Sequence, residues 1–165
     1  MVHLFALIFS TSITGVVLDQ PSVELGPHAL YFEDASGQVT IQDLRSGKHD
    51  AQFQKHDRDV PNFGLSNSFY WLKVDVINGM GVERLVFSNR YGLIDRFEFH
   101  VDLEGEDGSP QFGGDHLHFS KRYRSHKSIH FPLEIPSGTK ATLYVRAQTN
   151  GSMQLPIVIE TEQAF

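Results

Sequence analysis

The segment Ser68–Asn78, which reads Ser-Phe-Tyr-Trp-Leu-Lys-Val-Asp-Val-Ile-Asn, alternates between two kinds of side chain. Successive side chains of an extended strand point to opposite sides of the sheet, so every second residue shares a face. One face carries Tyr70, Leu72, Val74 and Val76. The other face carries Trp71, Lys73 and Asp75. The segment is therefore predicted to be a strand with one face in a core and one polar face.

The same alternation continues along the chain. Further strands are predicted at Arg84–Phe87, Arg96–Leu103, Ser128–Ile135, Ala141–Gln148 and Leu155–Thr161, with shorter ones at Ala29–Phe32 and Gln38–Ile41. Turn signals separate them, among them Asn78-Gly79, Asp107-Gly108 and Asn150-Gly151. No stretch with helical periodicity competes over more than two turns. The pattern predicts an all-β fold, a jelly-roll-like antiparallel β-sandwich that forms one domain over residues 25–165.

The composition excludes several classes of function. A chain of 165 residues fits one domain. Its formal net charge is −6 and no stretch forms a basic stripe, so no nucleic-acid partner is expected. The sequence contains no cysteine, which excludes disulfides, thiolate catalysis and cysteine zinc sites.

Residues 1–20 allow two interpretations. Leu4–Ile8 is continuously apolar and a weaker apolar run follows at Ile13–Leu18, which is shorter than the about 20 residues of a membrane span. The first interpretation is a secretory signal peptide, although no Lys or Arg precedes Arg45 and no clear cleavage site precedes Asp19. The second is an N-terminal strand. Export without cysteines would suit a bacterial periplasmic protein.

The polar faces of the predicted strands suggest a ligand-binding surface. Trp71 is the only tryptophan and lies among charged neighbours, so its ring could stack on the apolar face of a sugar or similar ligand. Four cationic or imidazole side chains on these faces could donate hydrogen bonds to the ligand: Lys73, Arg96, His130 and Arg146. The alternative is that a loop covers Trp71, which would then form a second, smaller core.

Other chemistries have weaker support, and no metal or other cofactor is expected. Four histidines gather late in the chain, at His116, His118, His126 and His130, but a metal site would need further ligands. The acidic run from Asp102 to Asp107 lacks the glycine and glutamate of a calcium loop and is predicted to be a solvated hairpin. A glycoside-acting enzyme would need two converging carboxylates, for which Asp75, Glu98 and Asp102 are candidates.

A series of short motifs runs in order from Tyr31 to Phe165. The most distinctive are Tyr31-Phe32-Glu33-Asp34, Phe69-Tyr70-Trp71-Leu72-Lys73, Leu93-Ile94-Asp95-Arg96-Phe97-Glu98-Phe99, Thr142-Leu143-Tyr144-Val145-Arg146 and Leu155-Pro156-Ile157. In this order the motifs resemble the type-2 extracellular domain of seven-transmembrane receptors with diverse intracellular signalling modules. The sequence departs from the family pattern at Lys73 and His118, which leaves the ligand class open.

The resemblance implies a sandwich similar to carbohydrate-binding modules, located outside the bacterial cytoplasmic membrane. It implies a ligand-sensing domain, not an enzyme, whose partners are a carbohydrate or other small molecule and a C-terminal seven-helix membrane region. The intracellular output would be a diguanylate cyclase or a histidine kinase, and a homodimer is left open. The alternative is a structural or protein-docking module without a small-molecule ligand. The resemblance assigns no individual binding residue.

Overall fold

The structure is a computed structural model that describes residues 15–118 and 128–165. Its strands are β1 (Val16–Leu18), β2 (Ser22–Glu24), β3 (Leu30–Asp34), β4 (Gln54–Lys55), β5 (Asn62–Leu65), β6 (Phe69–Asn78), β7 (Arg84–Asn89), β8 (Arg96–Leu103), β9 (Gln111–Gly113), β10 (Ile129–Glu134), β11 (Lys140–Gln148), β12 (Ser152–Gln154) and β13 (Ile157–Thr161). One short α-helix, α1 (Ile41–Arg45), and two 3-10 turns, Gly26–His28 and Asp50–Gln52, complete the described elements.

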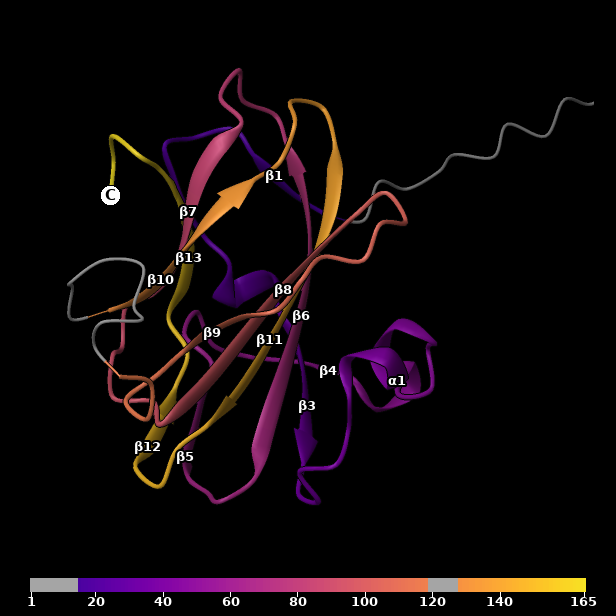
Figure 1. The fold of residues 1–165 in the computed structure, drawn as a ribbon, viewed down its shortest axis with the longest axis vertical. Coiled ribbons are helices and arrows are strands. Elements are labelled where there is room, and N and C mark those ends of the chain that lie inside the picture. Colours follow the sequence, from indigo (N-terminus) through magenta and orange to yellow (C-terminus); the bar gives the residue numbers. More distant parts are fainter. Residues whose placement is uncertain (1–14, 119–127) are drawn as a thin grey trace, which may run out of the picture.

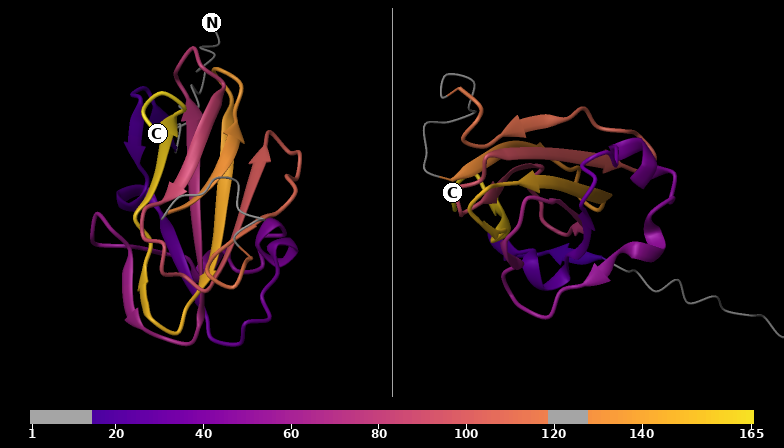
Figure 2. Two further views of the ribbon diagram at one scale, coloured as in Figure 1. Left: turned by 60° about the vertical axis from the view of Figure 1, so that its left-hand side comes forward. Right: turned by 90° about the horizontal axis from the view of Figure 1, so that it is seen from below.

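The strands form a sandwich of two main sheets. The larger sheet has seven strands in the order β4-β3-β6-β11-β8-β9, with β1 also paired to β6, and the smaller has the order β10-β7-β13-β2. All pairs are antiparallel except β1 with β6, and a separate two-stranded ribbon joins β12 to β5. Figure 1 shows α1 beside the large sheet, on the side away from the small one, and Figure 2 gives two further views. The predicted all-β sandwich is confirmed.

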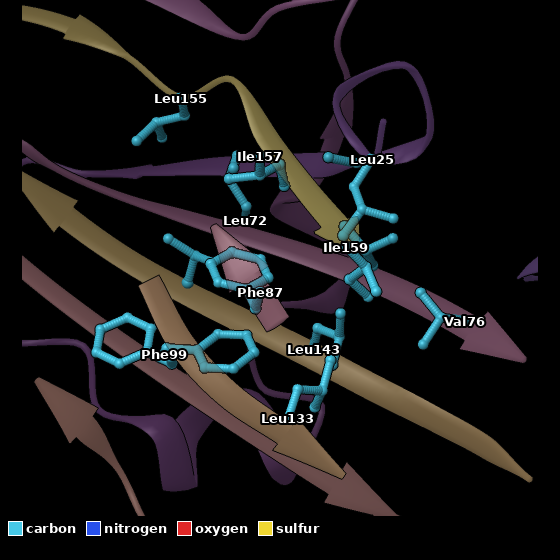
Figure 3. Close-up of a cluster of buried hydrophobic side chains, with 14 of the residues drawn as sticks. Leu25, Leu72, Val76, Phe87, Phe99, Leu133, Leu143, Leu155, Ile157 and Ile159 are labelled. Atoms are coloured by element: carbon cyan, nitrogen blue, oxygen red, sulfur yellow. The ribbon is translucent and has the colours of Figure 1, made fainter. Parts of the chain in front are cut away.

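The main core lies between the two sheets. The β6 residues predicted to face inward are all buried in it, namely Tyr70, Leu72, Val74 and Val76. Phe87 of the small sheet stacks on Phe99 of the large sheet, with ring centroids 4.0 Å apart (Figure 3). The alternation in β6 therefore predicted the core face correctly, because one side of each long strand meets the opposite sheet.

The structure corrects the predicted strand Gln38–Ile41. Thr40 instead caps α1: its side-chain oxygen accepts a hydrogen bond from the Asp43 amide at 3.2 Å, and the Asp43 carboxylate accepts one from the Thr40 amide at 3.0 Å. This reciprocal capping box satisfies amides that the first helical turn leaves unpaired, so the chain turns into a helix at Ile41.

The structure describes only part of residues 1–20, the segment for which the sequence allows a signal peptide or an N-terminal strand. Val16–Leu18 forms β1, and Leu18 is fully buried. Residues 1–14 lie outside the described residues, and a signal peptide there stays a prediction.

The predicted hairpin in the acidic run is confirmed. Leu103 and Glu106 exchange backbone hydrogen bonds of 3.0 and 2.7 Å across Glu104 and Gly105. Both of these central residues have positive φ, 41° and 92°, as a tight turn between two strands requires.

Candidate functional site

The outer face of the large sheet brings together four of the five predicted ligand-binding residues. Trp71 and Lys73 come from β6, Arg146 from β11 and Arg96 from β8, and these three strands are neighbours. Arg146 pairs in register with Trp71 on one side and with Glu98 of β8 on the other. The sheet therefore places an aromatic ring, an arginine and a carboxylate in one row.

His130 does not join this group. It belongs to β10 in the small sheet, is only 5% exposed, and has the ring of Phe165 at a centroid distance of 4.9 Å. The expectation that His130 lies with the other four on one open polar face is wrong. The alternation predicted that the side chains of His130 and Phe131 point to opposite faces of their strand. It could not predict which of the two sheets contains that strand.

Trp71 lies on the predicted face but is covered. Its side chain is 1% exposed because Ile41 and Leu44 of α1 pack over it, with Tyr144 of β11 beside it. We call the residues Ile41, Leu44, Trp71 and Tyr144 the second cluster. The expectation of an exposed tryptophan is wrong in this structure, and the alternative of a second, smaller core is confirmed.

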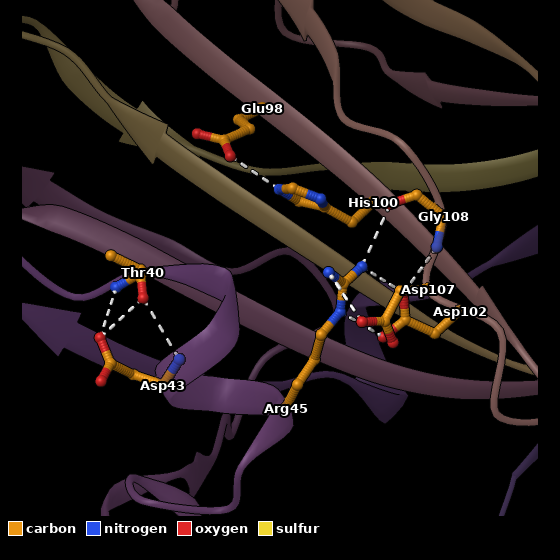
Figure 4. A network of polar contacts seen from close by, with 8 residues as sticks. All are labelled: Thr40, Asp43, Arg45, Glu98, His100, Asp102, Asp107 and Gly108. Carbon is orange, nitrogen blue, oxygen red and sulfur yellow. Dashed lines mark hydrogen bonds and ion pairs between the residues drawn. The ribbon is translucent and has the colours of Figure 1, made fainter.

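A polar network borders the second cluster, and Figure 4 shows the hydrogen bond between His100 and Glu98 in it. His100 Nε2 donates a hydrogen bond to Glu98 Oε1 at 2.7 Å, and Arg146 Nη1 lies 3.7 Å from Glu98 Oε2. The His100 hydrogen bond, with a further contribution from Arg146, lowers the pKa of Glu98. The Arg146 guanidinium also stacks on Phe69, with Cζ 4.0 Å from the ring centroid. Glu98 is thus held as an anion between two cationic or imidazole groups.

Ion pairs of Arg45 and Lys73 attach the segment that covers Trp71, which consists of α1 and the following 3-10 turn Asp50–Gln52, to the large sheet. Arg45 of α1 donates from Nη2 and Nε to the two carboxylate oxygens of Asp102 at 2.6 and 2.9 Å, and Nη2 also donates to the Gly108 carbonyl at 3.1 Å. Lys73 Nζ donates to Asp50, in the 3-10 turn that follows α1, at 3.2 Å. The ammonium of Lys73 is 5.9 Å from the Tyr144 ring centroid. Lys73 is therefore partly buried and links β6 to the segment that follows α1.

A shallow depression of about 340 Å³ lies on the same face next to the network. Its lining includes Arg96, Glu98, Phe112, His116 and Arg146. Phe112 of β9 pairs across the sheet with Glu98, and its side chain is 56% exposed. The exposed aromatic ring on this face is therefore Phe112, with exposed Arg96 and His116 in the same depression.

Sequence reasoning missed Phe112 and His116 as parts of one site. Phe112 stands alone between Gln111 and Gly113, without the apolar alternation that marks a strand. A signal for the cover did exist, because Thr40-Ile41-Gln42-Asp43 before Leu44 fits the capping-box pattern.

Two larger depressions offer less suitable chemistry. One of about 840 Å³ is lined by Glu83, Glu134 and Glu162 among others, and one of about 480 Å³ by His28, Lys55 and Lys73 among others. Among the described residues, neither lining includes a Phe, Tyr or Trp ring. We place the candidate site at the smaller depression because ligand sites combine an apolar surface with a few convergent polar groups.

Metal chemistry finds no support in the described part of the chain. Within residues 15–118 and 128–165, no three His, Asp or Glu side chains are grouped so that they could hold a metal ion. His126, one of the four histidines considered, lies outside the described residues.

Comparisons with known proteins bear on fold and family. The family model described as "7TMR-DISM extracellular 2" matches residues 26–161, which is most of the chain. No curated protein sequence matches the chain. None of the helices in the described residues has the length and apolar character needed to cross a membrane.

Two solved structures show limited similarity. The C-terminal CBM6 of LamC, a marine laminarinase from Zobellia galactanivorans, is 14% identical with a TM-score of 0.37, and the match covers 81% of this chain and 99% of that one. A GH31 alpha-xylosidase from Xanthomonas citri is 8% identical with a TM-score of 0.29, and the match covers 81% of this chain and 16% of that one. At such low TM-scores neither similarity supports a functional argument.

Proposed function

The chain belongs to the 7TMR-DISM extracellular 2 family, and we propose that it is the ligand-sensing domain of a bacterial membrane signalling receptor. The ligand is a carbohydrate or another small polar molecule, bound in the periplasm on the outer face of the large sheet. The full-length receptor would continue into a C-terminal seven-helix membrane region and an intracellular diguanylate cyclase or histidine kinase.

The single observation that carries the ligand class is the depression beside β9. An exposed phenyl ring at Phe112 gives a stacking surface for the apolar face of a sugar ring. Arg96 and His116 line the same depression and can donate hydrogen bonds to hydroxyl or carboxylate oxygens. Arg146 lines the depression in a fixed orientation, because it stacks on Phe69, donates to the Gly37 carbonyl at 2.8 Å and lies 3.7 Å from the Glu98 carboxylate.

Signalling in this proposal is a population shift. A ligand changes the equilibrium between two arrangements of the domain only by the difference between its affinities for them. The depression is lined by β8, β9 and β11, so a ligand that contacts all three strands favours one arrangement of the sheet over another.

A glycoside-acting enzyme is not favoured by the carboxylates. Asp102 is paired with Arg45, and Asp75 with Lys140 at 2.9 Å and with the Thr142 hydroxyl at 2.7 Å. Glu98 has a lowered pKa, whereas the general acid of a glycosidase needs a raised one. A structural or docking module remains the second candidate, because exposed Leu65 and Leu93 could contact a protein.

Calorimetric titration tests the proposal, with laminarihexaose, cellohexaose, maltohexaose, xylohexaose and glucuronate as probes. We expect at least one probe to bind, and Phe112→Ala and Arg96→Ala to weaken that binding at least about tenfold, the equivalent of about 1.4 kcal/mol. The matched controls are Leu65→Ala, an exposed apolar side chain outside the depression, and Arg84→Ala, an exposed arginine of the small sheet. Absence of heat with every probe, or equal losses in the controls, would contradict the proposal.

A further inference from the structure

Three side-chain nitrogens lie buried without a hydrogen-bond partner at the border of the second cluster: Trp71 Nε1, His100 Nδ1 and Arg146 Nε. The Trp71 and His100 side chains are 1% and 2% exposed. A buried donor or acceptor without a partner is costly, and such groups in a native protein call for a specific explanation. Here three occur on neighbouring strands of one sheet face.

The three groups are close to one another. The rings of Trp71 and His100 stack with centroids 6.4 Å apart, and Arg146 Cζ lies 5.5 Å from the Trp71 ring centroid. Trp71 and Arg146 are direct cross-strand neighbours. One small ligand group could therefore reach more than one of these nitrogens.

The chemistry of the three nitrogens defines a complementary ligand. Trp71 Nε1 and Arg146 Nε can only donate. His100 uses Nε2 to donate to the Glu98 carboxylate, which leaves Nδ1 to accept a hydrogen bond in the imidazole form and to donate one in the imidazolium form, and a ligand hydroxyl can serve either. A group that accepts two hydrogen bonds and donates one is a hydroxyl, and a pair of hydroxyls beside an apolar ring face is the pattern that a sugar presents to a tryptophan.

The cover over this surface is small and separable from the main core. The helix α1 has five residues and lies between Gly37 and Gly47, which have positive φ of 67° and 76°. Its buried side chains contact the second cluster and not the core between the sheets. Displacing α1 would break the ion pairs of Arg45 with Asp102 and Asp107 and remove Ile41 and Leu44 from Trp71 without separating the two sheets. Phe32, Val39 and Phe53, which are partly buried against the same cluster, would then form the rim of the opened surface.

The covered surface is continuous with the candidate site. Glu98 and Arg146 line the depression that contains Phe112, and both also border the second cluster through His100 and Trp71. We propose that α1 is a lid over a second sugar subsite, in which Trp71 is the stacking platform and His100 and Arg146 bind ligand hydroxyls. This inference rests on the proposed function, and it adds that binding in the depression is completed by displacement of α1.

The lid is tested first without a sugar, by acrylamide quenching of the intrinsic fluorescence, since Trp71 is the only tryptophan. Arg45→Ala removes the ion pair to Asp102, and we expect a several-fold larger quenching constant with unchanged far-ultraviolet circular dichroism. The matched control is Arg90→Ala, because Arg90 pairs with two carboxylates, Glu24 and Glu160, as Arg45 pairs with Asp102 and Asp107, but lies outside this face. Quenching of Arg45→Ala equal to that of the wild type would overturn the lid.

Hydrogen exchange of the wild-type protein is a second test of the lid, and it does not depend on whether Arg45→Ala folds. The amides of Leu44, Ser46 and Gly47, which are hydrogen-bonded within the helical segment, should exchange through an opening that is more frequent than global unfolding. Exchange of these amides only together with those of β6 and β11 would contradict a separable lid.

A further experiment tests the subsite by joining α1 covalently to β8, so that α1 cannot leave Trp71. The chain has no cysteine, so Arg45→Cys with Asp102→Cys can be joined site-specifically by a short bis-maleimide. The ligand is the oligosaccharide that binds the wild type best among laminarihexaose, cellohexaose, maltohexaose and xylohexaose. We expect the cross-linked protein to bind it about tenfold more weakly than the wild type does and to lose the change in Trp71 fluorescence. The control is the same double variant capped with N-ethylmaleimide, which should retain the fluorescence change.

The outcomes separate the two proposals. Binding that is equal in the cross-linked and capped proteins, without a change in Trp71 fluorescence, would overturn the subsite and leave the proposed function standing. Absence of binding by every oligosaccharide to the wild-type protein would overturn both.

Discussion

The two faces of β6 build two clusters of very different character. On the inner face, Leu72 and Val76 join a large core that also holds the stacked rings of Phe87 and Phe99. On the outer face, Trp71 belongs to a cluster of only four buried residues, which is covered by one short helix. The same strand thus contributes to both regions through alternate residues.

The difference lies in what borders each cluster. The main core is closed by a second sheet, whereas the second cluster is bordered by the polar side chains of His100, Glu98 and Arg146, of which His100 Nδ1 and Arg146 Nε are buried without a hydrogen-bond partner. The main core therefore joins the two sheets, whereas the second cluster joins a short helix to one sheet, and we propose that this helix can open. Substitutions in the main core should therefore destabilise the whole fold, whereas substitutions in the second cluster should act mainly on α1.

The largest expected effect comes from the main core. Phe99→Ala removes a ring stacked on both Phe87 and Phe131, and we expect it to lower the free energy of unfolding by about 3–5 kcal/mol. Urea denaturation followed by circular dichroism measures this loss. Leu65→Ala, at an 81% exposed position, should change the free energy by less than about 0.5 kcal/mol. A smaller loss for Phe99→Ala than for Leu44→Ala would contradict this difference between the two clusters.

A smaller effect is expected for the buried leucine of the cover. Leu44→Ala should cost about 2 kcal/mol, at the low end for a buried leucine, because a five-residue helix at the surface can settle into the space left. The loss should be accompanied by a red shift of Trp71 emission. Unchanged emission would show that Leu44 does not shield the indole.

The capping box should matter less again. Thr40→Ala removes the oxygen that accepts from the Asp43 amide, and we expect a loss of about 1 kcal/mol confined to α1. Hydrogen exchange should become faster in the helical segment and stay unchanged in β8 and β11. Thr40→Ser keeps an accepting hydroxyl and serves as the control, since it should behave like the wild type. Faster exchange throughout the large sheet would mean that the cover is not an independent unit.

The smallest effect is a pH dependence at the network. The hydrogen bond from His100 lowers the pKa of Glu98 from its ordinary value of 4.5. A depressed pKa in the folded state stabilises the fold above pH 4.5, and this stabilisation is lost as the pH falls through the folded pKa. The melting temperature of the wild type should therefore fall more steeply below pH 4.5 than that of Glu98→Gln. Parallel curves for the two proteins would contradict a stabilising Glu98 anion.

The large sheet was predicted well because its long strands β6, β8 and β11 alternate between inward apolar and outward side chains along most of their length. The segment predicted at Arg96–Leu103 has the same bounds as β8, and the inward side of β6 is the predicted one. Short strands such as β4 and β9 were not predicted, because two or three residues carry too little alternation to show a face.

The candidate site was predicted in part. Alternation assigned Trp71, Lys73, Arg96 and Arg146 to polar faces, and the structure places all four on the outer side of one sheet. It could not show that a helix about thirty residues earlier in the chain covers Trp71, nor that Phe112 pairs with Glu98, since both are contacts between distant segments. The prediction that His130 lies with these residues was wrong for the same reason, because the pairing of β10 with β7 is also a contact between distant segments.

The central claim is that ligands bind the outer face of the large sheet at β8, β9 and β11. The most direct measurement is amide chemical-shift mapping of the isotope-labelled protein during titration with the oligosaccharide that binds best. We expect the shifts to concentrate at Arg96–Glu98, Gln111–Gly113 and Arg146–Gln148, and also at Ile41–Arg45 where the ligand displaces α1. Shifts concentrated instead around Glu83, Arg84 and Glu162, or around His28 and Lys55, would contradict it.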